Sequence, residues 1–264
     1  FFMVGDNRIV MLVADVSGKG IPAAMFMMTA KTMLKNLASA GHSPAEVLTL
    51  AYRYLCQNNE ASMFVTVFLA QLQLDTGKLI AASAGHNPPL LARTGATYEF
   101  MKCKPELVLA AMEDVVYTER EIQFAPGDRI LLYTDGVTEA LNDAGEFYGE
   151  ARLRNFLNQD RVRELDVTAL LTTVKQELQR FANGAAQADD ITMLALEYKG
   201  GSARNSCKEL NIAAKIENLG PVMDFINREI KGANCSPREE MQINLAVEEI
   251  FTNIASYAYH PEVG

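Results

Sequence analysis

The fold of this chain is decided by the stretch Arg8-Ile9-Val10-Met11-Leu12-Val13-Ala14-Asp15-Val16-Ser17-Gly18-Lys19-Gly20. Its first part, Arg8 to Val16, is apolar and β-branched, which predicts a buried strand. The residues after Val16 form a glycine loop. Pro22 then marks a helix start, because the missing proline N–H costs nothing in the first turn. We expect this helix to cover residues 23–40. Asp15 then lies at the end of the predicted strand, just before the glycine loop.

Further acidic stretches occur far away in the sequence, at Tyr133-Thr134-Asp135-Gly136, at Glu139 and at Ala188-Asp189-Asp190-Ile191-Thr192. Asp15, Asp135 and Asp189 each lie at the end or the start of an apolar, strand-like run. We therefore expect the three carboxylates to converge on one divalent-metal site. Hard cations such as Mg²⁺ and Mn²⁺ prefer oxygen ligands of this kind.

Simpler roles remain open for single members of this set. Asp-Gly is a common turn dipeptide, so Asp135 taken alone could be only a turn former. Asp190 could exchange roles with Asp189 or cap a strand, and Asp189 is the preferred ligand. Asp6 is expected to be an ordinary turn residue.

The order of the other predicted elements indicates an α+β fold. A capping box at Ser43-Pro44-Ala45-Glu46 opens a second helix that runs to about residue 58. Predicted strands follow over 64–74, 79–83, 90–93, 97–101, 119–124 and 129–134, then a helix over 166–182 and a last strand over 191–198. Many antiparallel strands between helices favour a layered α+β domain over a βαβ repeat. The methionines of the first helix, Met25, Met27, Met28 and Met33, are expected in the core.

Composition excludes several classes of function. A formal net charge of −9 argues against a nucleic-acid-binding surface, because phosphate contacts need clustered Lys and Arg. No apolar run reaches the roughly 18 residues that span a bilayer, and no signal peptide is recognisable. The cysteines are scattered without metal-ligand spacing, which fits a reducing cytosol better than a disulfide framework. They are Cys56, Cys103, Cys207 and Cys235. We therefore expect a cytoplasmic protein.

A glycine-rich linker, Lys199-Gly200-Gly201-Ser202, predicts a boundary between two domains, 1–200 and 201–264. Beyond it we expect a strand near 209–213, a helix over 219–231 and a helix from Ser236 to about residue 259. Both ends of the sequence resemble cut ends, which indicates a piece of a longer protein.

Four motifs in this order closely resemble the sporulation stage II E-type serine phosphatases, a bacterial branch of the metal-dependent type 2C protein phosphatases. They are Ala14 to Gly20, Ala84-Gly85-His86-Asn87-Pro88-Pro89, Tyr133 to Ala140 and Asp189-Asp190-Ile191-Thr192. The similarity spans residue 1 to about residue 200. It implies an αββα sandwich of two antiparallel sheets flanked by helices. It also implies a site for two Mn²⁺ or Mg²⁺ ions and protein-serine/threonine phosphatase activity.

Carried over residue by residue, the resemblance implies that Asp15 bridges both metals and that the Val16 carbonyl is a backbone ligand. Asp135 and Asp189 are further ligands, and the same three carboxylates are the catalytic residues. The family usually has another ligand, the aspartate of a Gly-Gly-Asp-type motif, on a strand before the equivalent of Phe1. That motif is absent from this sequence. We therefore expect the full-length protein to be active and this chain to be weak or inactive.

The tail, residues 205–264, resembles the start of a histidine-kinase-like ATPase domain of the anti-sigma-factor serine-kinase type. The match is to Leu245-Ala246-Val247-Glu248-Glu249-Ile250-Phe251-Thr252-Asn253. Glu249 and Asn253 are four residues apart and share one helix face. The resemblance implies a base at Glu249 and a magnesium ligand at Asn253, in a truncated α/β ATPase-like segment. ATP and Mg²⁺ would bind only to a complete domain, and both residues could instead be ordinary solvated helix residues.

The two resemblances together predict a phosphatase fused to its opposing serine kinase in a bacterial partner switch. The implied substrate is phosphoserine on an anti-sigma factor antagonist-like protein. A sigma factor is a further expected partner, and a homodimer and an upstream membrane tether or sensor domain are left open. The competing hypothesis is a catalytically degenerate module that binds a partner through the helices over 23–58.

Three polar residues near the motifs keep alternative roles. His86 is expected to be a hydrogen-bonded residue of a rigid loop, and an acid–base role is the alternative. Ser17 and Lys19 could shape the loop beside the metals or touch phosphate.

Overall fold

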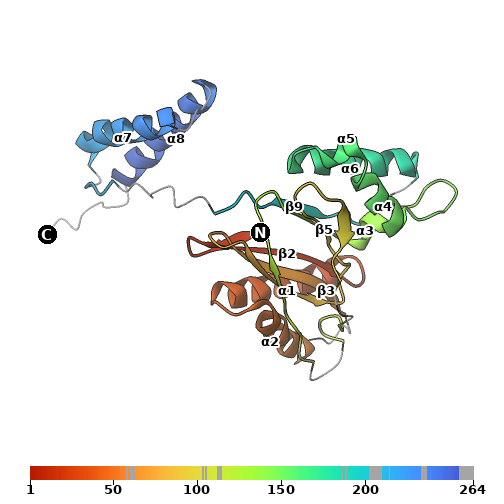
Figure 1. Cartoon of the computed structure of the whole chain (residues 1–264). Coiled ribbons are helices and arrows are strands. Elements are labelled where there is room, and N and C mark those ends of the chain that lie inside the picture. Colours follow the sequence, from red (N-terminus) through yellow and green to blue (C-terminus); the bar gives the residue numbers. More distant parts are fainter. Residues whose placement is uncertain are drawn as a thin grey trace. The chain divides into compact units, whose positions relative to one another are not determined.

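The computed structural model describes residues 1–57, 59, 63–102, 104, 106–111, 115–185, 187, 189–201, 210–213, 215–232 and 237–255 (Figure 1). The chain divides into two compact units, Phe1–Ala203 and Arg204–Gly264. The functional assignment of the domains predicted over 1–200 and 201–264 stays a prediction.

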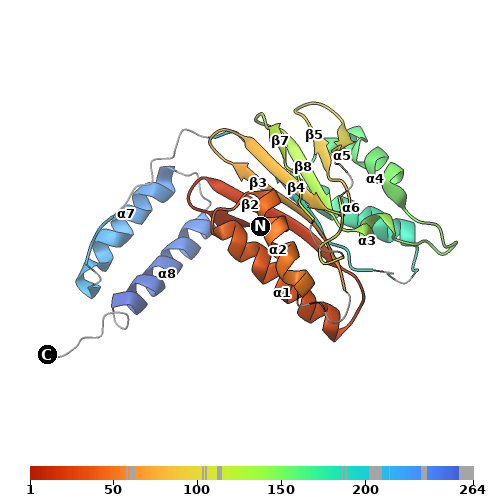
Figure 2. The ribbon, with the colours of Figure 1, turned by 90° about the horizontal axis from the view of Figure 1, so that it is seen from below.

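The first unit contains two antiparallel sheets. The first sheet has the strand order β1-β2-β3-β4-β7, and the second has the order β6-β5-β8-β9. Figure 2 shows β2, β3 and β4 side by side in the first sheet. The first sheet comprises β1 (Phe2–Val4), β2 (Arg8–Val16), β3 (Val65–Gln73), β4 (Lys78–Ala84) and β7 (Arg120–Gln123). The second comprises β5 (Leu90–Ala92), β6 (Tyr98–Phe100), β8 (Arg129–Tyr133) and β9 (Met193–Glu197).

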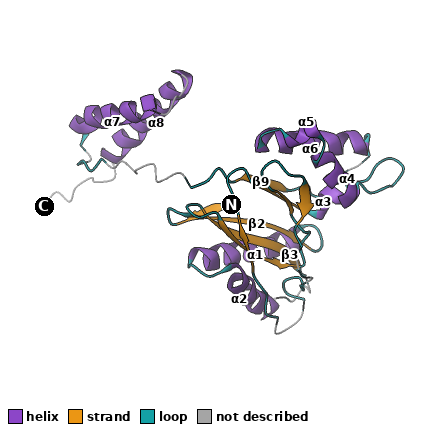
Figure 3. Ribbon diagram, viewed as in Figure 1, coloured by secondary structure: helices purple, strands orange, loops and turns teal. Residues whose placement is uncertain are grey.

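Helices cover the outer face of each sheet (Figure 3). The first sheet carries α1 (Ile21–Ser39) and α2 (Pro44–Gln57), and the second carries α4 (Gly149–Leu157), α5 (Asp160–Arg163) and α6 (Val167–Ala182). The predicted αββα sandwich of two antiparallel sheets is confirmed. In the described part of the chain, no helix is both long and apolar enough to cross a membrane.

The strands alternate their side chains between two apolar cores, because successive residues of a strand point to opposite faces of the sheet. On β8, Ile130 and Leu132 join the core between the two sheets, whereas Leu131 and Tyr133 join the core under α4 and α6. On β2, Met11 likewise belongs to the core between the sheets. Both sheets are therefore apolar on both faces, as their sequences predict.

The prediction that the methionines of the first helix lie in the core is wrong for two of them. Met25 and Met28 are 64% and 69% exposed, although they were expected in the core, while Met27 and Met33 pack partly buried on it. A helix buries one face, and the spacing of these methionines places two of them on the other. The short helices α4 and α5 were not predicted, because each buries few apolar residues and their periodic pattern is weak.

The second unit contains the short turn of helix η1 (Ile216–Asn218) and the helices α7 (Leu219–Gly232) and α8 (Pro237–Asn253). The strand predicted near 209–213 is wrong for residues 210–213, which form no strand. A strand needs a hydrogen-bonded neighbour, and the described residues of this unit supply none. Residue 209 and the predicted helix end at 256–259 lie outside the described residues.

The N-cap of α6 gives a direct test of this fold. The Asp166 carboxylate accepts hydrogen bonds from the N–H groups of Thr168 and Ala169 at 2.8 and 2.9 Å. Asp166→Ala removes this cap and should lower the free energy of unfolding by about 1 kcal/mol, whereas Asp166→Asn should retain most of it. Urea denaturation of the three chains measures the difference. Equal stability of the alanine variant and the unchanged chain would contradict the observed cap.

Candidate metal centre

Asp15 is held at the mouth of the sandwich by the end of β2. The β2–β3 register places it directly opposite Thr66, and the Val16 N–H donates to Asp15 Oδ1 at 3.0 Å. Pairing continues into the loop, because the Ser17 N–H donates to the Phe64 carbonyl and the Phe64 N–H donates to Ser17 Oγ. These hydrogen bonds fix the backbone that carries the Asp15 carboxylate. Ser17 therefore shapes the loop beside it.

Asp135 follows the end of β8 and is the first residue of the short helix α3 (Asp135–Thr138). Gly136 explains the Asp-Gly pair in physical terms. A Cβ at Gly136 would lie 2.3 Å from the Asp190 carbonyl oxygen, a distance that real side chains do not reach. Only glycine lets the segment with Asp189 and Asp190 pass so close to α3.

Thr134 joins β8 to that segment. Its N–H donates to the Thr192 carbonyl at 3.1 Å, and its hydroxyl oxygen accepts from the Thr192 N–H at 3.0 Å. The same hydroxyl donates to the Asp190 carbonyl at 3.1 Å. Thr134 is 2% exposed. No role was predicted for Thr134 from the sequence, although its place beside Asp135 in the motif was an available signal.

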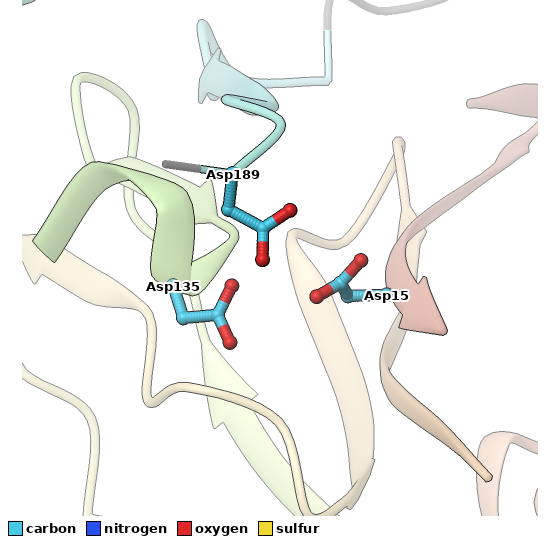
Figure 4. A group of neighbouring side chains, drawn as sticks. All are labelled: Asp15, Asp135 and Asp189. Atoms are coloured by element: carbon cyan, nitrogen blue, oxygen red, sulfur yellow. The ribbon is translucent and has the colours of Figure 1, made fainter. Parts of the chain in front are cut away.

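The structure brings together the three aspartates named in the sequence analysis (Figure 4). Asp15, Asp135 and Asp189 each offer one carboxylate oxygen, and these oxygens lie within 4.8 Å of one another. Figure 4 shows them converging from β2, from α3 and from the segment before β9. The Asp190 N–H donates to Asp189 Oδ1 at 2.8 Å, and Asp190 is outside the cluster, so the geometry favours Asp189 as the third carboxylate.

The cluster is electrostatically strained when it holds no cation. Burial, and then the charges of Asp135 and Asp189, raise the pKa of Asp15 from 3.8 to about 6. Asp135 Oδ1 is buried and has no hydrogen-bond partner among the described residues. A buried anionic oxygen without a donor is costly. A bound divalent cation would relieve both features, and an all-oxygen donor set suits a hard ion.

A cavity of about 620 Å³ opens onto two of these carboxylates. Val16, Lys19 and Asp190 also line it, together with the first turns of α1. The side chain of Glu139 is exposed and outside the cluster.

His86 has a different position. It is 8% exposed and does not line the cavity. Both ring nitrogens lie within hydrogen-bond distance of protein atoms, Nδ1 of the Thr66 hydroxyl and Nε2 of the Tyr133 carbonyl. These contacts favour the structural interpretation of His86.

The residues predicted to bind nucleotide belong to the second unit. Glu249 is exposed on α8, and Asn253 is the last residue of that helix. The side chain of Asn253 lies outside the described residues, and the nucleotide-binding role of both stays a prediction.

Burial and charge repulsion at Asp15 predict an unusual stability effect. The pKa of Asp15 is about 6 in the folded chain and near 3.9 when unfolded, so its ionisation destabilises the fold increasingly between about pH 4 and pH 6, and fully above pH 6. With metals chelated, Asp15→Asn should raise the free energy of unfolding by about 1–2 kcal/mol near pH 7.5, after discounting for solvent. The gain should disappear near pH 4, where the carboxyl is protonated in the folded chain. Urea denaturation at both pH values measures it, and a loss of stability at pH 7.5 would contradict this account.

Gly136 provides a second test of the geometry. Gly136→Ala places a Cβ against the Asp190 carbonyl, so the segment that carries Asp189 must move. We expect a loss of about 1–3 kcal/mol in the free energy of unfolding, which is typical of overpacking. Gly220→Ala is the matched control, because Gly220 has open space around it and no positive φ. Gly145 is less suitable, since its φ is positive. Equal effects of Gly136→Ala and Gly220→Ala would refute the close approach.

Comparison with known proteins gives consistent results. The family model described as Stage II sporulation protein E (SpoIIE) matches residues 5–199. Phosphoserine phosphatase RsbU of Bacillus subtilis (strain 168) is 37% identical over 205 residues, which cover 75% of this chain and 58% of RsbU.

Two solved structures share the fold. The RsbU and RsbW domains of Rv1364c from Mycobacterium tuberculosis superpose with a TM-score of 0.70 at 23% identity, covering 98% of this chain and 70% of that one. RsbX in complex with magnesium superposes with a TM-score of 0.52 at 16% identity, covering 74% and 83%.

The chain spans 34% to 58% of the length of the curated relatives that it matches. The family model nevertheless covers most of this chain, and the matched residues include all three clustered aspartates. The chain therefore belongs to the SpoIIE family.

Proposed function

We propose that the full-length protein is a metal-dependent protein-serine/threonine phosphatase with its site at Asp15, Asp135 and Asp189. The observation that carries this proposal is the convergence of their carboxylates from two sheets to within 4.8 Å. Membership of the SpoIIE family supports it, as does the relative named phosphoserine phosphatase RsbU.

The metals in this proposal are two Mn²⁺ or Mg²⁺ ions. Asp15 would bridge them, with the Val16 carbonyl, Asp135 and Asp189 as further ligands. The unpartnered oxygen of Asp135 supports a cation at this place, and the similar RsbX fold was solved with magnesium. Bound ions of this kind act as Lewis acids that activate water and neutralise phosphoryl charge.

The residues of the chain itself would hold and orient the reacting groups. The substrate is a serine or threonine phosphate ester, which water cleaves to the free hydroxyl and inorganic phosphate. The cavity of about 620 Å³ is large enough for a phosphorylated side chain. Lys19 on its wall supplies a positive charge that can attract the phosphoryl group, at a site where carboxylates otherwise dominate.

We further propose that the substrate is phosphoserine on an anti-sigma factor antagonist-like protein, in a partner switch that controls a sigma factor. In this proposal the second unit is the start of the opposing kinase, and in the complete domain Glu249 would be the base and Asn253 a magnesium ligand for ATP. The similar M. tuberculosis structure contains RsbU and RsbW domains and aligns with 98% of this chain, which supports a two-part arrangement.

A catalytically degenerate module that binds a partner is the second candidate. One observation favours it: Ile21, Met25 and Met28 of α1 are 77%, 64% and 69% exposed. Their spacing places them on one helix face, and exposed apolar groups of this kind mark interaction surfaces.

Metal binding separates the two candidates. We expect the full natural chain to bind Mn²⁺ in a calorimetric titration and to hydrolyse a phosphoserine peptide only with Mn²⁺ or Mg²⁺. Asp15→Asn should lower both metal affinity and kcat by more than about 100-fold. The loss of a metal ligand costs more affinity than the loss of a group that only orients a ligand. Asp6→Asn makes the same chemical change in an exposed turn and should leave both unchanged.

Two results would overturn the proposed phosphatase. One is the absence of Mn²⁺ binding at millimolar concentration in the full natural chain. The other is full hydrolytic activity of Asp15→Asn. Either result would leave the degenerate module as the better account.

A further inference from the structure

His86 lies where the chain passes from the first sheet to the second. β4 of the first sheet ends at Ala84, and β5 of the second begins at Leu90. Gly85 makes the turn with φ +65°, and a Cβ there would lie 2.4 Å from Val108 Cγ1. The side chain of His86, the next residue, is buried and 8% exposed.

The two ring nitrogens contact different sheets. Nδ1 lies 2.8 Å from the hydroxyl of Thr66 on β3, and Nε2 lies 3.1 Å from the carbonyl of Tyr133 at the end of β8. A carbonyl oxygen only accepts hydrogen bonds. Nε2 therefore carries the proton and donates, while Nδ1 accepts from the Thr66 hydroxyl. One neutral tautomer satisfies both contacts.

Each contact lies beside a clustered carboxylate. Thr66 is the direct cross-strand partner of Asp15, and its hydroxyl oxygen is 3.5 Å from the Asp15 carbonyl oxygen. Tyr133 precedes Thr134, whose hydrogen bonds hold the segment with Asp190, and Asp135 follows next. The imidazole thus connects Thr66, which lies opposite Asp15 in the first sheet, to the end of β8, two residues before Asp135.

The acid–base alternative for His86 fits these observations poorly. Both ring nitrogens are occupied by protein partners, and His86 does not line the cavity. Burial lowers the pKa of His86 to about 4, so the ring is neutral near pH 7.

We propose that His86 is a positioning residue that sets the separation between the Asp15 carboxylate and the carboxylates of Asp135 and Asp189. It does so by bridging Thr66 and the Tyr133 carbonyl across the two sheets. The proposal rests on the metal-binding function of the cluster. Metal affinity depends on ligand geometry, so the affinity for the ion is the quantity that His86 controls.

Paired variants test this role. His86→Phe keeps an aromatic ring and removes both hydrogen bonds, whereas His86→Gln keeps an amide donor for the Tyr133 carbonyl. Thr66→Val removes the partner hydroxyl with little change in volume, and Thr66→Ser retains it. Calorimetric titration with Mn²⁺ alone, on the full natural chain, gives the dissociation constant of each variant. Near-ultraviolet circular dichroism checks that each is folded.

We expect His86→Phe and Thr66→Val to raise the Mn²⁺ dissociation constant by about 10–100-fold, which is usual for groups that orient metal ligands. His86→Gln should recover part of the affinity, and Thr66→Ser most of it. With saturating Mn²⁺, the pH profile of kcat for p-nitrophenyl phosphate should keep both limbs seen in the unchanged chain, because His86 does not touch the substrate.

Two results would overturn the positioning role while leaving the phosphatase intact. One is unchanged Mn²⁺ affinity in folded Thr66→Val and His86→Phe. The other is a lower kcat at saturating Mn²⁺ in both His86 variants with one limb of the pH profile lost, which would make His86 an acid–base catalyst. A failure of the unchanged chain to bind Mn²⁺ is a different result and overturns the proposed function itself.

Discussion

Repulsion between carboxylates is the constraint on which the first unit depends. Oxygens of Asp15, Asp135 and Asp189 lie within 4.8 Å of one another. Their mutual repulsion adds to the cost of burial, and together these effects raise the pKa of Asp15 to about 6. The apolar core between the sheets opposes this repulsion, since separating the carboxylates would expose side chains such as Phe68 and Leu132, which are each 1% exposed. The sandwich therefore holds together a charge cluster that is unfavourable without a cation.

The carboxylates are oriented mainly by the loops at the sheet ends. The strands bring each aspartate to the mouth, but the hydrogen bonds of Ser17 and Thr134 and the close approach at Gly136 fix the segments around them. His86 connects the two sheets at the same level. Buried polar side chains such as Thr134 and His86 would destabilise the fold if they were unpaired. Their hydrogen bonds instead fix the segments that carry the aspartates. This arrangement explains why the motifs extend beyond the aspartates.

The strands and the three clustered aspartates could be predicted from the sequence, because short runs of neighbouring residues determine them. The strand Arg8–Val16 was predicted at both ends, since a run of apolar residues stops at a glycine loop. The helix α4 was missed because its apolar residues are few. The exposure of Met28 was missed because composition does not tell which side of a helix is covered. The contact between Thr66 and His86 depends on register and on the packing of two sheets, neither of which a single sequence reveals.

The central claim is that the three aspartates form a cation site. Anomalous diffraction from crystals of the full natural chain soaked in Mn²⁺ tests it most directly. We expect anomalous peaks at about 2.0–2.3 Å from oxygens of Asp15, Asp135 and Asp189. We also expect crystals of Asp15→Asn to lose those peaks. No peak at the cluster in millimolar Mn²⁺, with the three carboxylates still in place, would contradict it.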